Sequence, residues 1–186
     1  YHLNKHCPEK TYLIVEARDS LGGSWDFFRY PGVRSVSDMY TLGYSFEPWT
    51  GGKMFSDGPS IREYISRTSD KYDITKNILF GRKVQRASWS STDARWTIEA
   101  ESQDSKKPAY YSCNFIFSCS GYYDYEQAYQ PTFESSNDFE GKFFHSQFWP
   151  KGLDYKDKEV VVIGSGATAV TIVPAMAEST KHITML

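Results

Sequence analysis

The sequence predicts an α/β fold, and three segments of the chain indicate it. Residues 159–163 form a short apolar β run that leads into the small-residue loop 164–169 and then into a helical pattern. Residues 11–16 form a second β run, which ends in the acid Glu16. Short β segments separated by polar turns fill residues 78–119. Because a strand that turns through a glycine-rich loop into a helix is typical of dinucleotide-binding domains, we predict two Rossmann-like domains with a β-meander insertion, both incomplete in this chain.

The individual elements are predicted from periodicity and from turn and capping signals. Residues 1–7 are predicted to end a helix, and residues 12–15 to form a strand. A second helix begins at about Pro59 or Ser60, where Glu63 completes a capping box with Ser60. The other predicted elements are strands over 78–80, 84–89, 96–100 and 114–119 and a helix over 166–178, with Val170, Val173 and Ala177 toward the sheet.

Composition and charge exclude several classes of function. The chain has 186 residues, and its net charge of -2 comes from 21 basic and 23 acidic residues that are interspersed. A chain without a basic face has no footprint for nucleic acid, so we expect no nucleic-acid partner. No apolar run approaches the roughly 20 residues that cross a bilayer, so we expect no transmembrane segment. The chain starts without Met and ends within a β pattern, from which we expect a fragment.

The cysteines predict neither a metal site nor a disulfide framework. Cys7, Cys113 and Cys119 lack the paired spacing that either would need. We therefore expect a reducing, cytoplasmic location. We also expect Cys119 to pack rather than to act as a nucleophile, because no histidine accompanies it in a recognised arrangement.

The segment before the glycine-rich loop carries a motif that generic folding does not demand. It has the form Phe-x-Gly-x-x-x-His-x-x-x-Trp-Pro, with Phe139, Gly141, His145, Trp149 and Pro150 at the defined positions. This motif resembles the fingerprint of the type I Baeyer–Villiger monooxygenases, which are flavoproteins. The related flavin-containing monooxygenases that oxidise nitrogen and sulfur usually end a similar motif in another aromatic residue, so the Trp-Pro ending favours the Baeyer–Villiger branch.

A second pattern extends the resemblance toward the amino-terminus. Residues 22–25 (Gly-Gly-Ser-Trp) and 30–32 (Tyr-Pro-Gly) match the family form, but Val36 stands where the family has an aspartate. Residues 37–44 and 119–123 are similar to the subgroup that includes the ethionamide-activating monooxygenase. The resemblance runs essentially from end to end.

The resemblance implies cofactors, a reaction and domain limits. It implies a partial FAD-binding domain over 1–138 that lacks its first strand and glycine-rich loop, a fingerprint linker over 139–154, and the start of an NADP-binding domain over 155–186. The implied reaction uses FAD, NADPH and O2 to insert one oxygen atom into a ketone, giving an ester or lactone, with sulfur oxidation as a second activity. The family's catalytic arginine lies beyond the chain end, so no residue of the chain is assigned a catalytic role, and we expect the chain to be inactive alone.

The candidate cofactor residues fall into five groups. Glu16 ends the second strand of a βαβ unit, where an acid accepts hydrogen bonds from a ribose. Val84 touches the adenine in similar flavoproteins, although a strand valine explains it equally well. We expect His145 to be structural or conformational rather than a general base. The other candidates are Gly23, Ser24 and Trp25, then Arg34, Ser35 and Val36, and for NADPH the loop residues Gly164, Ser165, Gly166, Ala167, Thr168 and Ala169.

Two alternative functions stay open. The first is a flavin-containing monooxygenase that oxygenates nitrogen or sulfur, which differs from the leading prediction because it forms no lactone from a cyclic ketone and oxidises only amines and sulfides. The second is a truncated, non-catalytic module that binds a nucleotide or a partner. Flavin absorbance and NADPH oxidation separate the second alternative from both enzymes.

Overall fold

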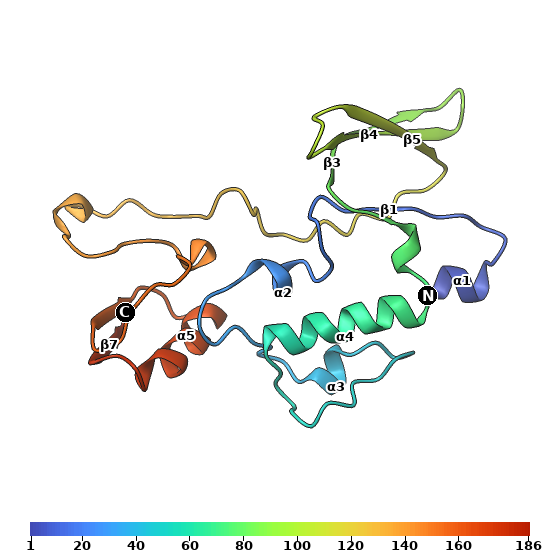
Figure 1. The fold of residues 1–186 in the computed structure, drawn as a ribbon. Helices are drawn as coiled ribbons and strands as arrows, with labels where there is room; N and C mark the ends of the chain where they lie inside the picture. The colour runs from blue at the N-terminus through green and yellow to red at the C-terminus, as the bar shows by residue number, and fades with distance from the viewer. The chain divides into compact units, whose positions relative to one another are not determined.

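The computed structural model describes residues 1–186, and these divide into two compact units. The first unit joins Tyr1–Gly23 to Ile65–Tyr122, and the second joins Ser24–Tyr64 to Tyr123–Leu186. Each unit is therefore built from two separate stretches of chain (Figure 1). The predicted domain limits at residues 138 and 154 stay a prediction.

The chain contains five α-helices, three 3-10 helices and seven strands. The α-helices are α1 (His2–His6), α2 (Ser24–Phe27), α3 (Met39–Leu42), α4 (Gly58–Lys71) and α5 (Ala167–Ala177). The 3-10 helices are η1 (Thr75–Asn77), η2 (Ser136–Asp138) and η3 (Ser146–Phe148). The strands are β1 (Ile14–Val15), β2 (Ile78–Leu79), β3 (Arg82–Ser90), β4 (Arg95–Ser102), β5 (Pro108–Cys113), β6 (Glu159–Val162) and β7 (His182–Met185).

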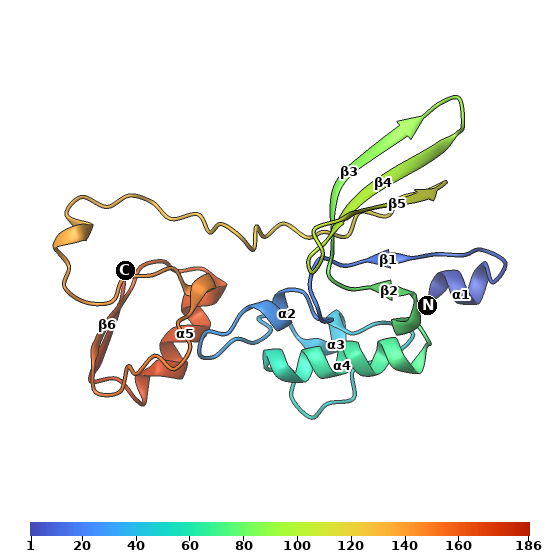
Figure 2. The same cartoon turned by 45° about the horizontal axis from the view of Figure 1, so that its top comes forward.

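The first unit contains a short parallel pair and an antiparallel meander. β1 pairs with β2 in parallel, with Ile14 opposite Ile78. β3, β4 and β5 follow one another in an antiparallel sheet (Figure 2). Trp89 and Trp96 are directly opposite in this sheet, and their rings lie 5.4 Å apart. These strands confirm the predicted β-meander.

One predicted strand is wrong. Residues 114–119 form no strand, and the third strand of the meander is instead β5, which ends at Cys113. The predicted segment is apolar, but no neighbouring strand pairs with it, and the side chains of Phe115 and Phe117 are 83% and 79% exposed. An apolar sequence forms a strand only where a partner satisfies its backbone.

The second unit has its core between a helix and a parallel strand pair. β6 and β7 pair in parallel, and α5 lies beside them (Figures 1 and 2). Tyr30, Ile172 and Met176 are the buried members of the core cluster. Partly buried side chains surround them, from Phe28, Val33, Trp149, Tyr155, Val160, Val162 and Ile183.

The predicted helix over 166–178 is confirmed, but its predicted inward face is wrong. The buried residues of α5 are Ala169, Thr171, Ile172 and Met176, whereas Val170 is 52% exposed. Nearly every position of this helix is small or apolar, so the sequence alone could not select the face.

The start of α4 also differs from the prediction. The Ser60 N–H donates to Oδ1 of Asp57 at 2.8 Å, and the helix begins at Gly58. Asp57 is therefore the capping residue, and the predicted capping box of Ser60 and Glu63 is wrong. The bond and the Ser60 hydroxyl hold the pKa of the Asp57 carboxyl below its ordinary value.

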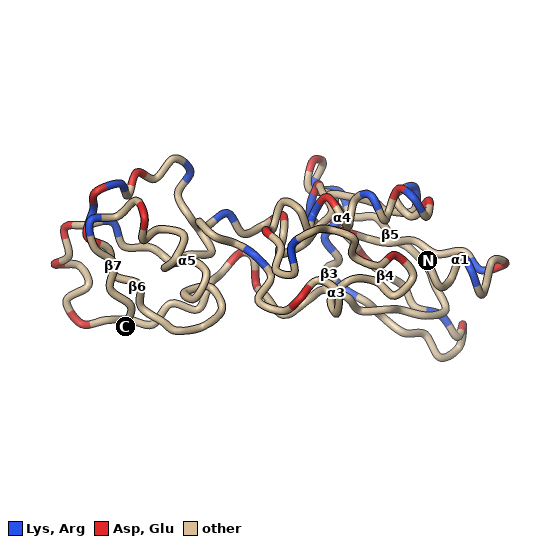
Figure 3. The backbone as a smooth tube through the Cα atoms, turned by 90° about the horizontal axis from the view of Figure 1, so that it is seen from below, with Lys and Arg blue, Asp and Glu red and all other residues tan.

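The surface charges and the helix lengths add two further findings. Acidic and basic residues are interspersed along the whole chain (Figure 3). None of the helices combines the length and the apolar character that crossing a bilayer requires.

Candidate functional site

The loop between β6 and α5 has an open backbone. Gly164 has a φ of +126°, which favours glycine, and its N–H donates to the carbonyl oxygen of Leu186 at 2.8 Å. A Cβ atom added to Gly164 or Gly166 would meet no heavy atom within 4 Å. A ligand can therefore approach the backbone of this loop closely.

The amino-terminus of α5 is suited to an anion. Gly166 is the N-cap, and no side chain caps the helix, so the first N–H groups have no partner within the helix. Ser165 and Ala167 are exposed beside this end, Thr168 is half-buried, and Ala169 is buried against the rest of the unit. A small buried residue at the last position lets the helix pack closely on its strand. The unpaired N–H groups and the helix dipole both favour a phosphate here.

Glu16 lies directly after β1, as predicted for the end of that strand. Its N–H donates to the carbonyl oxygen of Leu79 at 3.0 Å, and its own carbonyl oxygen accepts from the Arg82 N–H at 2.9 Å. Oε1 of its carboxylate accepts from the Arg18 N–H at 2.8 Å. A carboxylate has about four lone-pair sites, so Glu16 can also accept from a hydroxyl of a ligand.

The segment around Gly22–Gly23 is a tight turn followed by a short helix. Gly22 and Gly23 have φ angles of +112° and +51°, which only glycine adopts without strain. In the second unit, Oγ of Ser24 lies 3.2 Å from the hydroxyl oxygen of Tyr125. Trp25 is half-buried. The predicted residues of this segment therefore lie in a half-buried turn and at the start of the short helix that follows it.

Arg34, Ser35 and Val36 alternate in direction. Ser35 is buried, with its N–H donating to the Ser56 carbonyl oxygen at 2.9 Å and its Oγ accepting from the Ser56 N–H at 3.0 Å. Arg34 is exposed and forms a β-bridge with Asp57, and Val36 is 56% exposed. Of the three candidates, Arg34 and Val36 can therefore face a ligand, whereas the Ser35 hydroxyl is engaged within the fold.

The fingerprint residues perform structural roles in this fold. Nδ1 of His145 accepts a hydrogen bond from the Gln147 N–H at 3.1 Å and caps η3. This bond requires an unprotonated Nδ1, which assigns the proton of the neutral ring to Nε2. The Trp149 ring meets Phe144 and Tyr155 edge to face, at centroid distances of 5.3 and 6.2 Å.

The remaining fingerprint positions shape the chain on either side. A Cβ atom on Gly141 would lie 2.5 Å from the ring of Phe139, so glycine allows that ring to fold back. The carbonyl oxygen of Pro150 accepts from the Leu153 N–H at 3.2 Å and closes a turn before β6. Val84 lies on β3, exposed, beside a bulge between Val84 and Arg86.

Sequence reasoning missed two buried polar side chains. The Asp26 side chain is 6% exposed, and its Oδ1 pairs with Arg62 at 2.6 Å and with Arg29 at 3.3 Å. Gln147 is also buried, and its Nε2 donates to the carbonyl oxygen of Asp124 at 2.6 Å. The Asp26–Arg29 spacing is a weak helical signal, but nothing in the sequence indicates the partners of Arg62 or Gln147.

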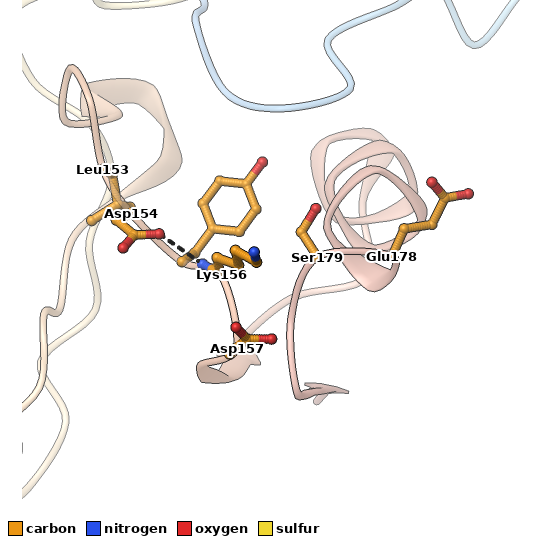
Figure 4. Close-up of a pocket in the computed structure, with 7 residues that line it drawn as sticks. Leu153, Asp154, Lys156, Asp157, Glu178 and Ser179 are labelled. Carbon is orange, nitrogen blue, oxygen red and sulfur yellow. Dashed lines mark hydrogen bonds between the residues drawn. The ribbon is translucent and has the colours of Figure 1, made fainter.

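A surface hollow of about 400 Å³ lies at the other end of α5 (Figure 4). Asp154, Asp157 and Glu178 line it together with Lys156 and Ser179. Carboxylates beside a helix carboxyl-terminus repel phosphate. This hollow is therefore not a candidate for the nucleotide site.

Comparisons with known proteins place the chain among flavin monooxygenases. A family model described as Flavin-binding monooxygenase-like matches residues 53–186. The chain is 52% identical over 187 residues to the FAD-containing monooxygenase EthA of Mycobacterium tuberculosis, covering 100% of this chain and 38% of that protein. The chain thus spans well under half the length of the curated relatives it matches.

Solved structures share the fold. The complex of OTEMO with FAD and NADP is 31% identical, with a TM-score of 0.72 over 93% of this chain and 34% of that one. Oxidised steroid monooxygenase bound to NADP is 27% identical, with a TM-score of 0.79 over 100% of this chain and 35% of that one. These results confirm the predicted α/β fold class and the resemblance that the motifs carry.

Proposed function

We propose, on the premise that this chain belongs to the flavin-binding monooxygenase-like family, that it is part of an FAD- and NADPH-dependent monooxygenase. The proposed reaction inserts one oxygen atom from O2 into a ketone and gives an ester or lactone, with oxidation of a sulfur-containing substrate as a second activity. The observation that carries the proposal is the open, uncapped glycine-rich loop at the start of α5.

The residues of this loop fit the NADPH pyrophosphate. Neither Gly164 nor Gly166 carries a side chain that would block the approach, and the space at both Cβ positions is open. The N–H groups at the start of α5 would donate to the phosphate oxygens, since no side chain of the protein occupies them. Ser165 and Ala167 would lie beside the phosphates.

The residues proposed for FAD also suit that cofactor, and they are considered separately for the two units. Glu16 would accept from a ribose hydroxyl while its Oε1 keeps the bond to Arg18. Gly23, Ser24 and Trp25 would let the backbone and a flat ring approach the cofactor. When bound, FAD supplies the redox chemistry that links NADPH to O2.

Arg34 and Val36 are proposed to face the reacting groups. Both side chains are exposed, and Ser35, which lies between them in the sequence, fixes the backbone of this segment through its hydrogen bonds to Ser56. Arg34 would offer donors to a phosphate or an oxygen of the cofactor. Val36 offers no charge, so an arginine approaching this position would not be held by a carboxylate.

The names of related proteins support a ketone substrate but name no sulfur-containing one, so the two classes of substrate need a direct test. Cyclohexanone monooxygenase, a solved structure 25% identical to the chain, is named for a ketone, whereas EthA is named only as an FAD-containing monooxygenase. Incubating the full-length protein with FAD, NADPH and 18O2 would discriminate between them. Label in a lactone formed from a cyclic ketone supports the proposal, whereas label in sulfoxides alone favours the nitrogen- and sulfur-oxygenating alternative.

Replacing Gly166 with aspartate tests the nucleotide site without unfolding the helix. Aspartate is a favourable N-cap, and the φ of -75° and ψ of -176° at Gly166 suit it, so Gly166→Asp should keep or raise the melting temperature. Its carboxylate would compete for the helix N–H groups and repel phosphate, weakening NADPH binding by roughly tenfold or more. Gly166→Asn is the neutral control and should weaken binding less. Equal NADPH affinity in all three proteins would contradict this site.

A further inference from the structure

Gln147 lies at an undefined position of the fingerprint, yet it is the most buried residue of that segment. It is 8% exposed, on η3 between His145 and Trp149. Its side-chain Nε2 donates to the carbonyl oxygen of Asp124 at 2.6 Å, and its backbone N–H donates to Nδ1 of His145 at 3.1 Å. Side chain and backbone are thus both fixed.

The segment that Gln147 holds is packed on α2. The Tyr125 ring stacks on Phe27, with centroids 4.3 Å apart and an interplanar angle of 23°. Its hydroxyl oxygen lies 3.2 Å from Oγ of Ser24. On the other side of Asp124, the Tyr123 ring meets Phe28 edge to face at 5.1 Å. Tyr125 therefore packs against α2, and Tyr123 packs against the residue that follows this helix.

The other end of the fingerprint is packed toward α5. Two residues after Gln147, Trp149 lies against the core cluster of Tyr30, Ile172 and Met176. Ile172 and Met176 belong to α5, the helix that begins at the glycine-rich loop. Gln147 thus joins the fingerprint to residues 123–125, which pack on α2, and Trp149 joins it to the core cluster that includes two residues of α5.

We infer that Gln147 is a positioning residue that sets the distance between the glycine-rich loop and the segment beginning at Ser24. The inference rests on the proposed function, in which these two segments hold the nicotinamide cofactor and the flavin. Gln147 touches neither cofactor in this arrangement. It acts through the Asp124 carbonyl group, because the single side-chain bond at 2.6 Å joins the fingerprint to the segment that covers α2.

A change in this distance should lower the rate constant for hydride transfer. A misplacement of about 1 Å can cost about 100-fold in rate when two reactants must meet in a fixed geometry. Binding of NADPH should change less, because the contacts at the start of α5 do not include Gln147. The expected signature is therefore a lower rate constant for flavin reduction with a nearly unchanged NADPH affinity.

The test uses the full-length flavoprotein in stopped-flow reduction by NADPH without oxygen. Gln147→Met keeps the side-chain length and apolar contacts but removes the donor. It should lower the limiting rate constant for flavin reduction about tenfold, with an NADPH dissociation constant within about threefold of the parent. The isotope effect with NADPH deuterated at the transferred position should stay the same or rise. Gln130→Met, at an exposed position in the same connecting segment, is the matched control and should leave all three values unchanged.

A second variant guards against a folding defect. Tyr125→Phe keeps the ring that stacks on Phe27 and removes the hydroxyl that lies beside Ser24, so it should show the same signature at about two- to fivefold. An unchanged reduction rate in Gln147→Met, or equal losses of reduction rate, NADPH affinity and melting temperature, would overturn the inference. A parent protein that binds FAD and is reduced by NADPH upholds the proposed function whichever way the variants behave. A parent without flavin or without reduction overturns both.

Discussion

Gly32 lies so close to Thr171 that a Cβ atom on Gly32 would be 2.3 Å from the Thr171 carbonyl oxygen. The same Cβ atom would be 2.7 Å from the Cβ of Ala175, one helical turn further along α5. Gly32 ends the Tyr-Pro-Gly turn, and Tyr30 from the same turn is buried in the core with Ile172. The turn that leads to Arg34–Val36 is therefore packed directly against α5, the helix that follows the glycine-rich loop.

We expect Gly32→Ala to be strongly destabilising because two separate effects add. The φ of +79° at Gly32 costs an alanine about 1–2 kcal/mol, and overlap with α5 adds roughly 1–3 kcal/mol. Gly152→Ala is the matched control, since Gly152 has a φ of +70° but open space around its Cβ position. Denaturant unfolding of both variants should therefore show the larger loss for Gly32→Ala. Equal losses would mean that α5 moves away freely.

Val36→Asp should increase activity in the full-length protein. Val36 is 56% exposed, so a carboxylate there stays hydrated and can pair with an arginine. A charge-assisted hydrogen bond contributes about 1.5–3 kcal/mol, so NADPH consumption coupled to product should rise roughly 10- to 100-fold. Val36→Asn, which cannot form an ion pair, should gain much less. Identical product yields from Val36, Asp and Asn proteins would refute the importance of this position.

The cap of α4 should make part of the stability depend on acid pH. Asp57→Ala should cost about 1 kcal/mol of unfolding free energy, as for other N-caps, and Ser60→Ala should cost less, because only its hydroxyl is removed. The folded-state pKa of Asp57 is lowered from its ordinary value of 3.8 by the Ser60 N–H. The stabilisation is therefore complete above the ordinary pKa and is lost as the pH falls through the folded pKa.

Unfolding of the parent and of Asp57→Ala should be followed from pH 7 down to about pH 2, the range that covers the carboxyl titration. The difference between the parent and Asp57→Ala should be constant above about pH 5 and shrink below about pH 4. If Ser60→Ala were the more damaging substitution, the predicted capping box rather than Asp57 would control the helix start.

The sequence predicted the elements whose local signals agree with their surroundings. The apolar run before Gly164, the helix after Gly166 and the β-meander were each predicted and are found. The strand predicted over residues 114–119 was wrong because an apolar pattern does not indicate whether a partner strand is present. The buried face of α5 was predicted wrongly because its sequence is apolar on all sides, so the side chains that pack on it, among them Tyr30 and Val160, determine that Ile172 and Met176 are buried.

The residues of the candidate site also divide into those that local sequence predicts and those that depend on distant partners. The loop 164–169 could be predicted, because its function depends on the backbone and on the absence of side chains. Ser35 could not be distinguished from Arg34 and Val36, since its direction depends on Ser56, 21 residues away. Gln147 could not be found either, because its partner is a carbonyl oxygen 23 residues earlier, and every residue type carries that group.

Asp26 should stabilise the protein mainly through Arg62 rather than Arg29. The Asp26 side chain is 6% exposed, and the two arginine side chains are 48% and 58% exposed. Because water reaches both guanidinium groups, Asp26→Asn should cost about 2 kcal/mol, less than the roughly 3–5 kcal/mol of breaking a fully buried pair. A double-mutant cycle with Arg62→Gln should give a coupling near 1–2 kcal/mol, and one with Arg29→Gln should stay below about 1 kcal/mol. The N–O distances of 2.6 and 3.3 Å set this order. Urea unfolding of the single and double variants measures both couplings, and a larger coupling to Arg29 would show that the helical neighbour, not the contact with α4, holds the carboxylate.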